Sequence, residues 1–402
     1  MALDSVRGIA RRRVLAWSGA AAAGVPLVGA PAAGARSSIP PDARPGGAYD
    51  RYVAKLAADG RFSGVVLLSH RGRTVLSRSY GMADRERGIR NHEGTAFSLS
   101  SAGKPFHAVA ILQLAQRGKL QLSDPVGKYL RGLDKEIAER VSVHHLLSGA
   151  SGLAGPEEDV ERVFRSRAEV HAYYVHRAEQ STLVDVPGLP STTHAEPEVL
   201  LPALVVEAVA GTTYWDYVEQ HVFRRCGMTG SGFFTRPRWL TDGHVAHPYM
   251  EVAGGSVVDA VRHLDAGSAY PYLAGRNPAR AFIDAPGDGG FATAPDLVRF
   301  AYALRDGTLL DRPWADVLTG AKLPHGPASF GAYGVAIDIV GGQWAFQRAG
   351  GNPGVGANWS IYPDTGWVGV ILGNCDGAPL EEMIARETAA VTGVVPEGGA
   401  GG

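Results

Sequence analysis

The chain has 402 residues, of which 45% are hydrophobic and 20% charged, and its formal net charge is −1. This composition is that of an ordinary globular protein with a sizeable core, and it excludes a disordered or fibrous chain. Residues 1–35 carry a local charge of +3, so the remainder carries −4. We therefore expect no surface suited to nucleic acid.

The first 35 residues have the features of an export signal. Arg11, Arg12 and Arg13 precede an apolar segment of small residues, and an Ala-Gly-Ala site for a signal peptidase follows at 33–35. We predict a twin-arginine-type signal at 1–35 and a Pro/Gly-rich linker at 36–47. The mature chain is then periplasmic, in the cell wall or extracellular, without a membrane span. The alternative is a cytosolic protein with a basic tail.

The apolar pattern changes twice along residues 48–394, which we expect to form one domain. A short helix is predicted at 48–59 and a β-hairpin at 63–69 and 74–80. Helical and loop segments dominate next, with helices expected at 101–116, 143–147, 197–209, 214–223 and 295–304. Strand-like alternation returns at 333–340, 344–348, 358–362 and 367–372, before a closing helix at 380–391.

Strands at both ends of the domain and helices in its middle predict an α+β fold. One antiparallel sheet is assembled from the two termini, with helices on its faces. The sheet lobe is expected to comprise 48–100 and 324–394, and the mainly helical lobe 101–323. Residues 395–402 are predicted to be a disordered tail.

A Ser-x-x-Lys pattern at Ser101 and Lys104 is the main indication of chemistry. It opens the apolar run 108–114, which has helical spacing. Residues three apart share a helix face, so Lys104 can reach the Ser101 hydroxyl, and a lysine in a dry pocket can take the proton of a serine nucleophile. Such a short pattern also arises by chance. However, the chain has only six lysines, and Lys104 alone follows a serine at this spacing.

The cysteines and histidines give no sign of a metal. Cys226 and Cys375 are compatible with one disulfide in an exported protein and equally with two buried free thiols. No histidine and cysteine cluster has metal-ligand spacing, and His144 and His145 lack the HExxH pattern. We therefore assign no metal and no cofactor.

Five segments in order resemble the serine beta-lactamase and penicillin-recognising superfamily, in the branch of class C beta-lactamase-like enzymes, D-alanyl-D-alanine carboxypeptidases and esterases. The segments are 97–104, 141–153, 211–218 with 226–228, 289–296, and 350–354 continuing to 372–374. The resemblance spans about 48–394 and implies the fold predicted above. It also implies that Ser101 is the acyl-enzyme nucleophile and Lys104 its proton acceptor.

The second motif of that family, Tyr-x-Asn, is replaced by His194-Ala195-Glu196. Neutral histidine accepts protons near neutral pH, so we expect His194 to serve as the proton shuttle in place of tyrosine. One alternative is a decayed motif with His194 on a solvent-facing loop. Another is an alignment near His176, in which Tyr173 or Tyr174 supplies the phenol.

Glu196 places a carboxylate where the family has a neutral amide. Close to Lys104, this carboxylate would raise the lysine pKa and keep the amine protonated. Proton abstraction would then pass to His194, and Lys104 would stabilise the developing Ser101 alkoxide. Turned outward to water, Glu196 would have little effect.

The third motif, Lys-Thr-Gly or His-x-Gly, is replaced by Arg348-Ala349-Gly350. Arg348 is expected to hold an anionic substrate group or to pair with Glu196, and it cannot transfer a proton. Gly350 allows close approach of the substrate, and the resemblance implies an oxyanion hole made by the amides of Ser101 and Gly351. Residues 350–354 also fit a strand-end turn.

Because two motifs are rewritten, we rank beta-lactam hydrolysis below ester, amide or peptide hydrolysis. The sequence predicts an exported serine acyl hydrolase acting on a small-molecule or peptide-like acyl substrate. Its catalytic residues are Ser101, Lys104 and His194, and its substrate-binding residues Glu196, Arg348 and Gly350. The alternatives are a biosynthetic transacylase that passes the acyl group to an amine or alcohol, and a catalytically impaired protein that binds ligands or peptidoglycan.

Overall fold

The computed structural model describes residues 39–190 and 196–394. Eight strands form one antiparallel sheet in the order β11-β12-β13-β14-β15-β16-β1-β2. Their bounds are β1 Gly64–His70, β2 Arg73–Tyr80, β11 Leu323–Gly326, β12 Ser329–Gly331, β13 Ala336–Val340, β14 Gln343–Asn352, β15 Val355–Tyr362 and β16 Trp367–Gly373. The N-terminal strand β1 pairs with the C-terminal strand β16, from Gly64 opposite Gly373 to His70 opposite Trp367. The prediction of a sheet built from both termini is confirmed.

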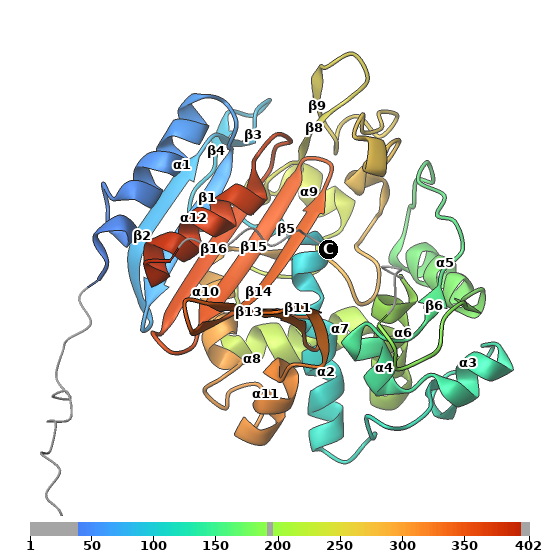
Figure 1. Ribbon diagram of the computed structural model, residues 1–402. Helices are drawn as coiled ribbons and strands as arrows, with labels where there is room; N and C mark the ends of the chain where they lie inside the picture. The colour runs from blue at the N-terminus through green and yellow to red at the C-terminus, as the bar shows by residue number, and fades with distance from the viewer. Residues whose placement is uncertain (1–38, 191–195, 395–402) are drawn as a thin grey trace, which may run out of the picture. The chain divides into compact units, whose positions relative to one another are not determined.

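Helices cover both faces of this sheet, and the alternation along β1 shows why (Figure 1). Val65 and Leu67 belong to the core shared with the helical lobe, whereas Val66 and Leu68 belong to a second core beneath α1 (Ala48–Ala58) and α12 (Leu380–Thr392). Successive strand residues point to opposite faces, so a strand buried on both sides reads as a continuous apolar run.

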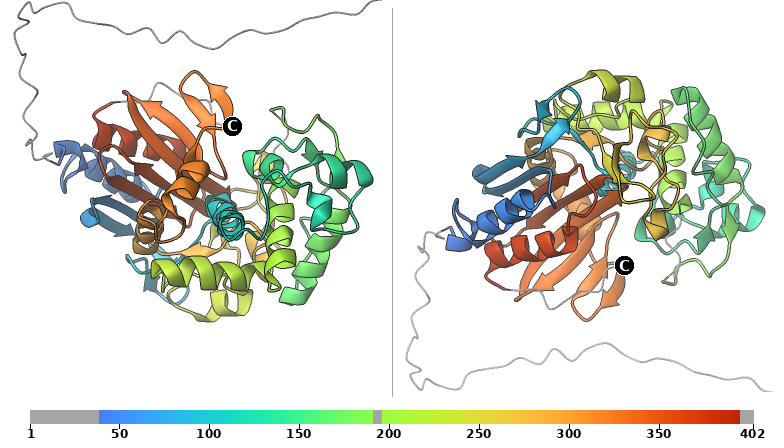
Figure 2. Two further views of the ribbon diagram at one scale, coloured as in Figure 1. Left: turned by 90° about the horizontal axis from the view of Figure 1, so that it is seen from below. Right: turned by 90° about the horizontal axis from the view of Figure 1, so that it is seen from above.

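The remaining helices all lie between β2 and β11 in sequence. Helix α10 packs against β1, β15 and β16, whereas α3, α4, α5 and α6 belong to the helical lobe that stands beside the sheet in the views of Figure 2. Their bounds are α2 Pro105–Gln116, α3 Lys135–Arg140, α4 Val143–Ser148, α5 Arg167–Glu179, α6 Pro197–Ala210, α7 Tyr214–Val218, α8 Arg224–Cys226, α9 Arg236–Thr241, α10 Ala294–Ala303 and α11 Arg312–Thr319. A π-helical turn at Glu219–Phe223 continues α7. Four two-stranded pairings complete the fold: β3 Met82–Asp84 with β4 Ile89–Arg90, β5 Phe97–Ser98 with β10 Phe291–Ala292, β6 Leu153–Ala154 with β7 Thr182–Leu183, and β8 Tyr249–Glu251 with β9 Val257–Asp259.

Several segments differ from the sequence-based expectation, and two of them show the physical reason. The C-terminal part of the expected linker packs on the domain, because Pro41–Ala43 forms a 3₁₀ turn whose Ala43 is fully buried in the α1–α12 core. Helix α5 was not predicted; its mixed polar sequence hides the apolar stripe that buries Val170, Tyr174 and Ala178. Within the described ranges, no helix combines the length and hydropathy needed to cross a bilayer.

Candidate active site

Ser101 lies in a tight turn where the sheet meets the helical lobe. Residues Ser100–Gly103 form a 3₁₀ turn that leads directly into α2, which begins with Pro105. Ser100 has a φ of 47°, a left-handed conformation that is costly for a residue with a side chain. Ser101 itself is half-buried. The turn therefore stores local strain next to the predicted nucleophile.

The sheet binds two carbonyl groups of this turn. Arg348 Nε on β14 donates to the Ser101 carbonyl oxygen at 3.0 Å, and Trp359 Nε1 on β15 donates to the Ala102 carbonyl oxygen at 3.0 Å. Arg348 is half-buried, and burial lowers its pKa, which nearby Asp288 counteracts. Arg348 thus fixes the backbone of Ser101, the predicted nucleophile, and the sequence did not reveal this contact.

Gly350 lets β14 approach the turn. A Cβ atom at this position would lie 2.2 Å from the Leu99 oxygen, 2.4 Å from the Ala102 nitrogen and 2.9 Å from the Ser101 nitrogen. No side chain fits there. The next residue, Gly351, accepts a hydrogen bond from Ser100 Oγ at 2.9 Å through its carbonyl oxygen. The structure therefore brings Ser101, Arg348, Gly350 and Gly351 together.

Lys104 is buried beside this turn, with 6% of its surface exposed. Burial lowers its pKa from 10.5 to about 8; Asp288 and Glu198 act in the opposite direction, and Arg348 adds to the lowering. A lysine in this state has an appreciable neutral fraction at mildly alkaline pH and can accept a proton. The neighbouring His107 on α2 is also buried, and its pKa falls to about 4, so this imidazole is neutral near pH 7.

Glu196 has a different partner from those considered in the sequence analysis. Its carboxylate forms an ion pair with the buried Arg177 of α5, at 2.5 Å from Nη2 and 2.9 Å from Nε. Burial raises the Glu196 pKa and Arg177 counteracts this. The carboxylates that raise the Lys104 pKa are instead those of Asp288 and Glu198. The expected pairing of Glu196 with Lys104 or Arg348 is replaced by a structural ion pair at the start of α6.

The predicted shuttle, His194, lies outside the described residues, which resume at Glu196. The alternative alignment around His176 finds no support in the geometry. The His176 side chain is 67% exposed on α5 and faces Glu179 at 3.7 Å. Tyr174 is buried within the helical lobe, and Tyr173 OH contacts the Asp159 amide.

Asp288 and Glu198 are site residues that sequence reasoning missed. Glu198 on α6 accepts hydrogen bonds from the amide of Ser151 at 3.1 Å and from its hydroxyl at 2.7 Å. Asp288 stands in a glycine-rich run, one residue before the segment at 289–296 that carries part of the family resemblance. The sequence signal that could have identified Asp288 is an acidic residue among glycines, directly before a segment of the family resemblance.

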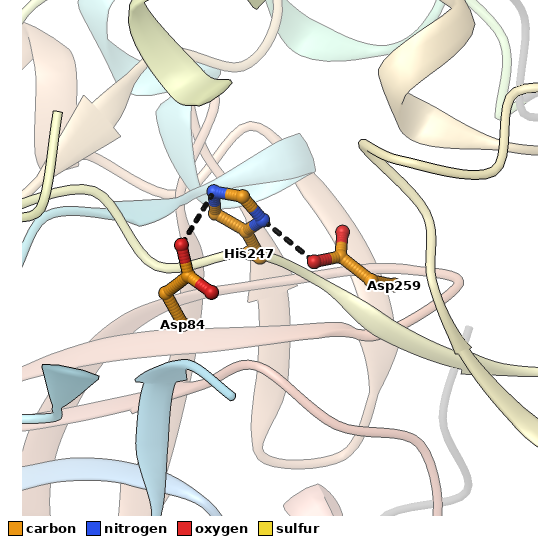
Figure 3. Close-up of side chains that lie close together, drawn as sticks. All are labelled: Asp84, His247 and Asp259. Atoms are coloured by element: carbon orange, nitrogen blue, oxygen red, sulfur yellow. Dashed lines mark hydrogen bonds and ion pairs between the residues drawn. The ribbon is translucent and has the colours of Figure 1, made fainter. Parts of the chain in front are cut away.

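A second cluster of titratable side chains joins Asp84 of β3, Asp259 of β9 and His247 just before β8 (Figure 3). Ligand-type atoms of Asp84, His247 and Asp259 fall within 4.8 Å of one another. Both ring nitrogens of His247 have partners, Asp259 Oδ2 at 2.8 Å and the Trp239 carbonyl oxygen at 2.8 Å. Arg262 binds both carboxylates, so its guanidinium already supplies the positive charge. We assign no metal to this cluster, because its donors form a complete ion-pair network.

Cys226 and Cys375 are separate half-buried free thiols. Burial raises the pKa of both, to about 12 for Cys226. A thiol with a raised pKa is a poor nucleophile. Neither cysteine is therefore a candidate nucleophile.

Comparison with known proteins defines the class to which this fold and site belong. The model of the family described as Beta-lactamase matches residues 49–392. The chain therefore belongs to the Beta-lactamase family.

The individual proteins to which this chain is similar have different names. The chain is 28% identical over 285 residues to PbpX of Bacillus subtilis (strain 168), which is a penicillin-binding protein by its name. The match covers 71% of this chain and 64% of PbpX, so the chain spans less than two thirds of that relative. It is 39% identical over 93 residues to esterase EstB of Burkholderia gladioli, covering 22% of this chain and 24% of EstB. The solved structure of EstCE1, described as a hydrolase with promiscuous acyltransferase activity, has a TM-score of 0.68 at 22% identity and covers 86% of this chain and 97% of EstCE1.

Proposed function

We propose that this protein is a serine acyl hydrolase that acts on an ester or amide through an acyl-enzyme at Ser101. The observation that carries the proposal is the burial of Lys104 three residues after Ser101, with a pKa lowered to about 8. A buried amine of this kind can take the serine proton without a metal or cofactor. Membership of the Beta-lactamase family and similarity to an esterase support the same reaction.

The proposed reaction has two stages. In acylation, Ser101 Oγ forms a bond to the substrate carbonyl carbon while its proton passes to Lys104 Nζ, and the leaving alcohol or amine departs with a proton. In deacylation, water adds to the acyl carbon, the acid leaves and Ser101 regains its proton. The amides of Ser101 and Gly351 are the proposed donors to the oxyanion, and His194 the proposed shuttle to the leaving group.

Reaction with a fluorophosphonate probe, followed by intact-mass spectrometry, tests the nucleophile. The Ser101 oxygen would form a bond to phosphorus, fluoride would leave and Lys104 would accept the proton. We expect one adduct on the wild type and none on Ser101→Ala. Ser123→Ala is the matched control, because it removes an exposed hydroxyl in the loop after α2 and leaves the turn that carries Ser101 unchanged. Absence of an adduct on the wild type would overturn the proposal and favour a ligand- or peptidoglycan-binding protein.

Acyl transfer is the second candidate, favoured by the acyltransferase activity in the description of EstCE1. Turnover of an activated ester with and without added amines or alcohols distinguishes the two. Free acid as the main product supports a hydrolase, whereas a dominant amide or new ester supports a transferase. In either case His194→Ala should lower turnover at least about tenfold, and unchanged turnover would refute the role of His194.

We also propose that the chain is exported through the signal at 1–35. The three arginines, the apolar segment of small residues and the Ala-Gly-Ala site support this proposal. An esterase that acts outside the cytoplasm would meet acyl groups of the cell wall or of the medium.

A further inference from the structure

We call the turn Ser100–Gly103, which carries Ser101, the nucleophile turn. The segment 287–290, Gly-Asp-Gly-Gly, packs against this turn and its flanking residues through three contacts. The Leu99 amide donates to the Gly290 carbonyl oxygen at 2.9 Å, and His107 Nδ1 contacts the Gly287 carbonyl oxygen at 2.9 Å. Between these contacts, a Cβ at Gly103 would lie 1.9 Å from the Gly289 oxygen. The segment therefore follows the turn from Leu99 to the first helical turn of α2.

This packing leaves room for one side chain only. A Cβ at position 287 would meet the Val199 oxygen at 2.1 Å, and one at position 289 would meet the Asp284 carboxyl carbon at 2.4 Å. Positions 289 and 290 also have φ values of +68° and +91°, which favour glycine. Asp288 is the single residue of the four that projects a functional group.

The position of Asp288 follows from the contact between Gly103 and Gly289. Lys104 is the residue after Gly103, and Asp288 is the residue before Gly289, so both side chains leave the backbone next to the same contact. Asp288 Oδ1 accepts a hydrogen bond from the Gly289 amide at 2.9 Å, which orients the carboxylate. Among the charged groups that shift the Lys104 pKa, Asp288 has the largest effect, and its charge raises this pKa. The charge of Asp288 also raises the pKa of Arg348.

We propose that Asp288 is a positioning residue of the active site, whose carboxylate holds the charges of Lys104 and Arg348 in place and sets the pH range in which Lys104 takes the proton of Ser101. The inference rests on the proposed function. The charge of Asp288 opposes the effect of burial on Lys104, because a nearby anion favours the protonated amine. Without it, Lys104 would lose its proton at lower pH.

Among the described residues, other titratable groups on the neighbouring elements act on Lys104 or lie beside Asp288. Glu198 on α6 favours the protonated amine, whereas Arg348 on β14 disfavours it. His107 on α2 is neutral above about pH 5, because burial lowers its pKa to about 4. Asp284, next to Asp288, accepts a hydrogen bond from the Gly290 amide, and burial raises its pKa to about 7. Each group is retained when Asp288 is replaced.

The test is the rate of Ser101 modification by the fluorophosphonate between pH 5.5 and 10 in Asp288→Asn. Asparagine keeps the shape and the acceptor for the Gly289 amide and removes only the charge. We expect the acid limb of the profile to move to lower pH, with a rate at pH 6.5 about fivefold above wild type. Asp288→Glu should restore the wild-type limb, a rescue that a purely structural role would not predict.

Asp364→Asn is the matched control, since it makes the same change at an exposed position on the β15–β16 turn, at the end of β15 remote from Ser101. Its profile should coincide with that of the wild type. Only folded protein is modified at Ser101; if Asp288→Asn does not fold, Asp288→Ser removes the same charge and should show the same shift. A labelled variant whose acid limb coincides with the wild type would overturn the role of Asp288 alone. A wild type that is not modified would overturn the proposed function, and the role of Asp288 with it.

Discussion

At the scale of single residues, the site depends on small side chains that allow close packing around Ser101. Gly350 is the clearest case, because the nucleophile turn occupies the space where its Cβ would stand. Three backbone atoms lie within 3 Å of that point, and backbone cannot move aside as a flexible side chain can. The identity of residue 350 is therefore fixed by the turn and not by the substrate alone.

Gly350→Ala should push β14 away from Ser101 and break the contact of Arg348 with the Ser101 carbonyl. We expect Ser101 modification to fall at least about 100-fold and the free energy of unfolding to fall by about 2 kcal/mol. Gly356→Ala on β15 is the control, because the nearest atom to its Cβ is a Leu380 methyl at 4.0 Å. Equal rates for both variants and the wild type would show that the close approach is unimportant.

Short motifs in the sequence mark Ser101, Lys104, Gly350 and Gly351, and the structure places these four residues around one turn. Their roles in catalysis and in the oxyanion hole stay predictions. The partner of Glu196 was not predictable, because Arg177 lies on α5, a helix whose polar sequence gave no strong signal. Asp288 and Glu198 were missed for a related reason: their influence on Lys104 depends on three-dimensional packing, which spacing along the chain does not encode.

At the scale of elements, α12 is joined to the sheet by a buried carboxyl group. Glu387 is fully buried, and its carboxyl occupies the space that the missing side chain of Gly369 on β16 leaves. A Cβ atom at position 369 would lie 2.1 Å from Glu387 Oε1. Burial raises the Glu387 pKa from 4.5 to about 8. The carboxyl is thus neutral in the folded protein near pH 7 and ionised in the unfolded chain.

This difference makes stability depend on pH. Between about pH 4.5 and 8 the folded state holds a proton that the unfolded state has lost, so the free energy of unfolding decreases as pH rises through this range. Glu387→Gln should remove this decrease, which is of the order of a few kcal/mol. Denaturant unfolding at pH 5 and pH 8 measures it, with Glu381→Gln, an exposed residue of the same helix, as the control. An unchanged pH slope in Glu387→Gln would refute this explanation.

Elements with strong periodicity were the predictable ones. The hairpin β1–β2, the helices α1, α6 and α12 and the strand β16 match the expected ranges closely. The prediction at 101–116 was one helix, whereas the structure has a 3₁₀ turn and then α2 from Pro105. The division arises because the sheet binds the turn carbonyls from outside the helix, a tertiary contact that local propensity does not contain.

At the scale of the whole molecule, the two ends of the domain build the sheet and the middle of the chain builds the helical lobe. The nucleophile turn lies where they meet, so the site needs residues more than 240 positions apart, such as Ser101 and Arg348. The family resemblance, based on five short segments, implied this fold. The membership of the chain in the Beta-lactamase family confirms the resemblance.

The proposed export concerns the whole chain and can be tested separately. Changing Arg11, Arg12 and Arg13 to lysine keeps the charge and removes the arginine pattern. We expect the full-length variant to stay inside bacterial cells, with at least about tenfold less protein outside the cytoplasm than for the wild type. Immunoblotting of cell fractions measures this ratio. Equal export of the variant would show that the arginines do not act as the signal.

The proposed reaction requires above all that Lys104 makes Ser101 reactive. The rate of Ser101 modification should rise about tenfold per pH unit below pH 8 and level off above it, following the loss of a proton from Lys104. In Lys104→Ala the rate should fall at least about 100-fold at pH 8. A rate that is the same across this pH range, or that persists without the Lys104 amine, would contradict this role of Lys104.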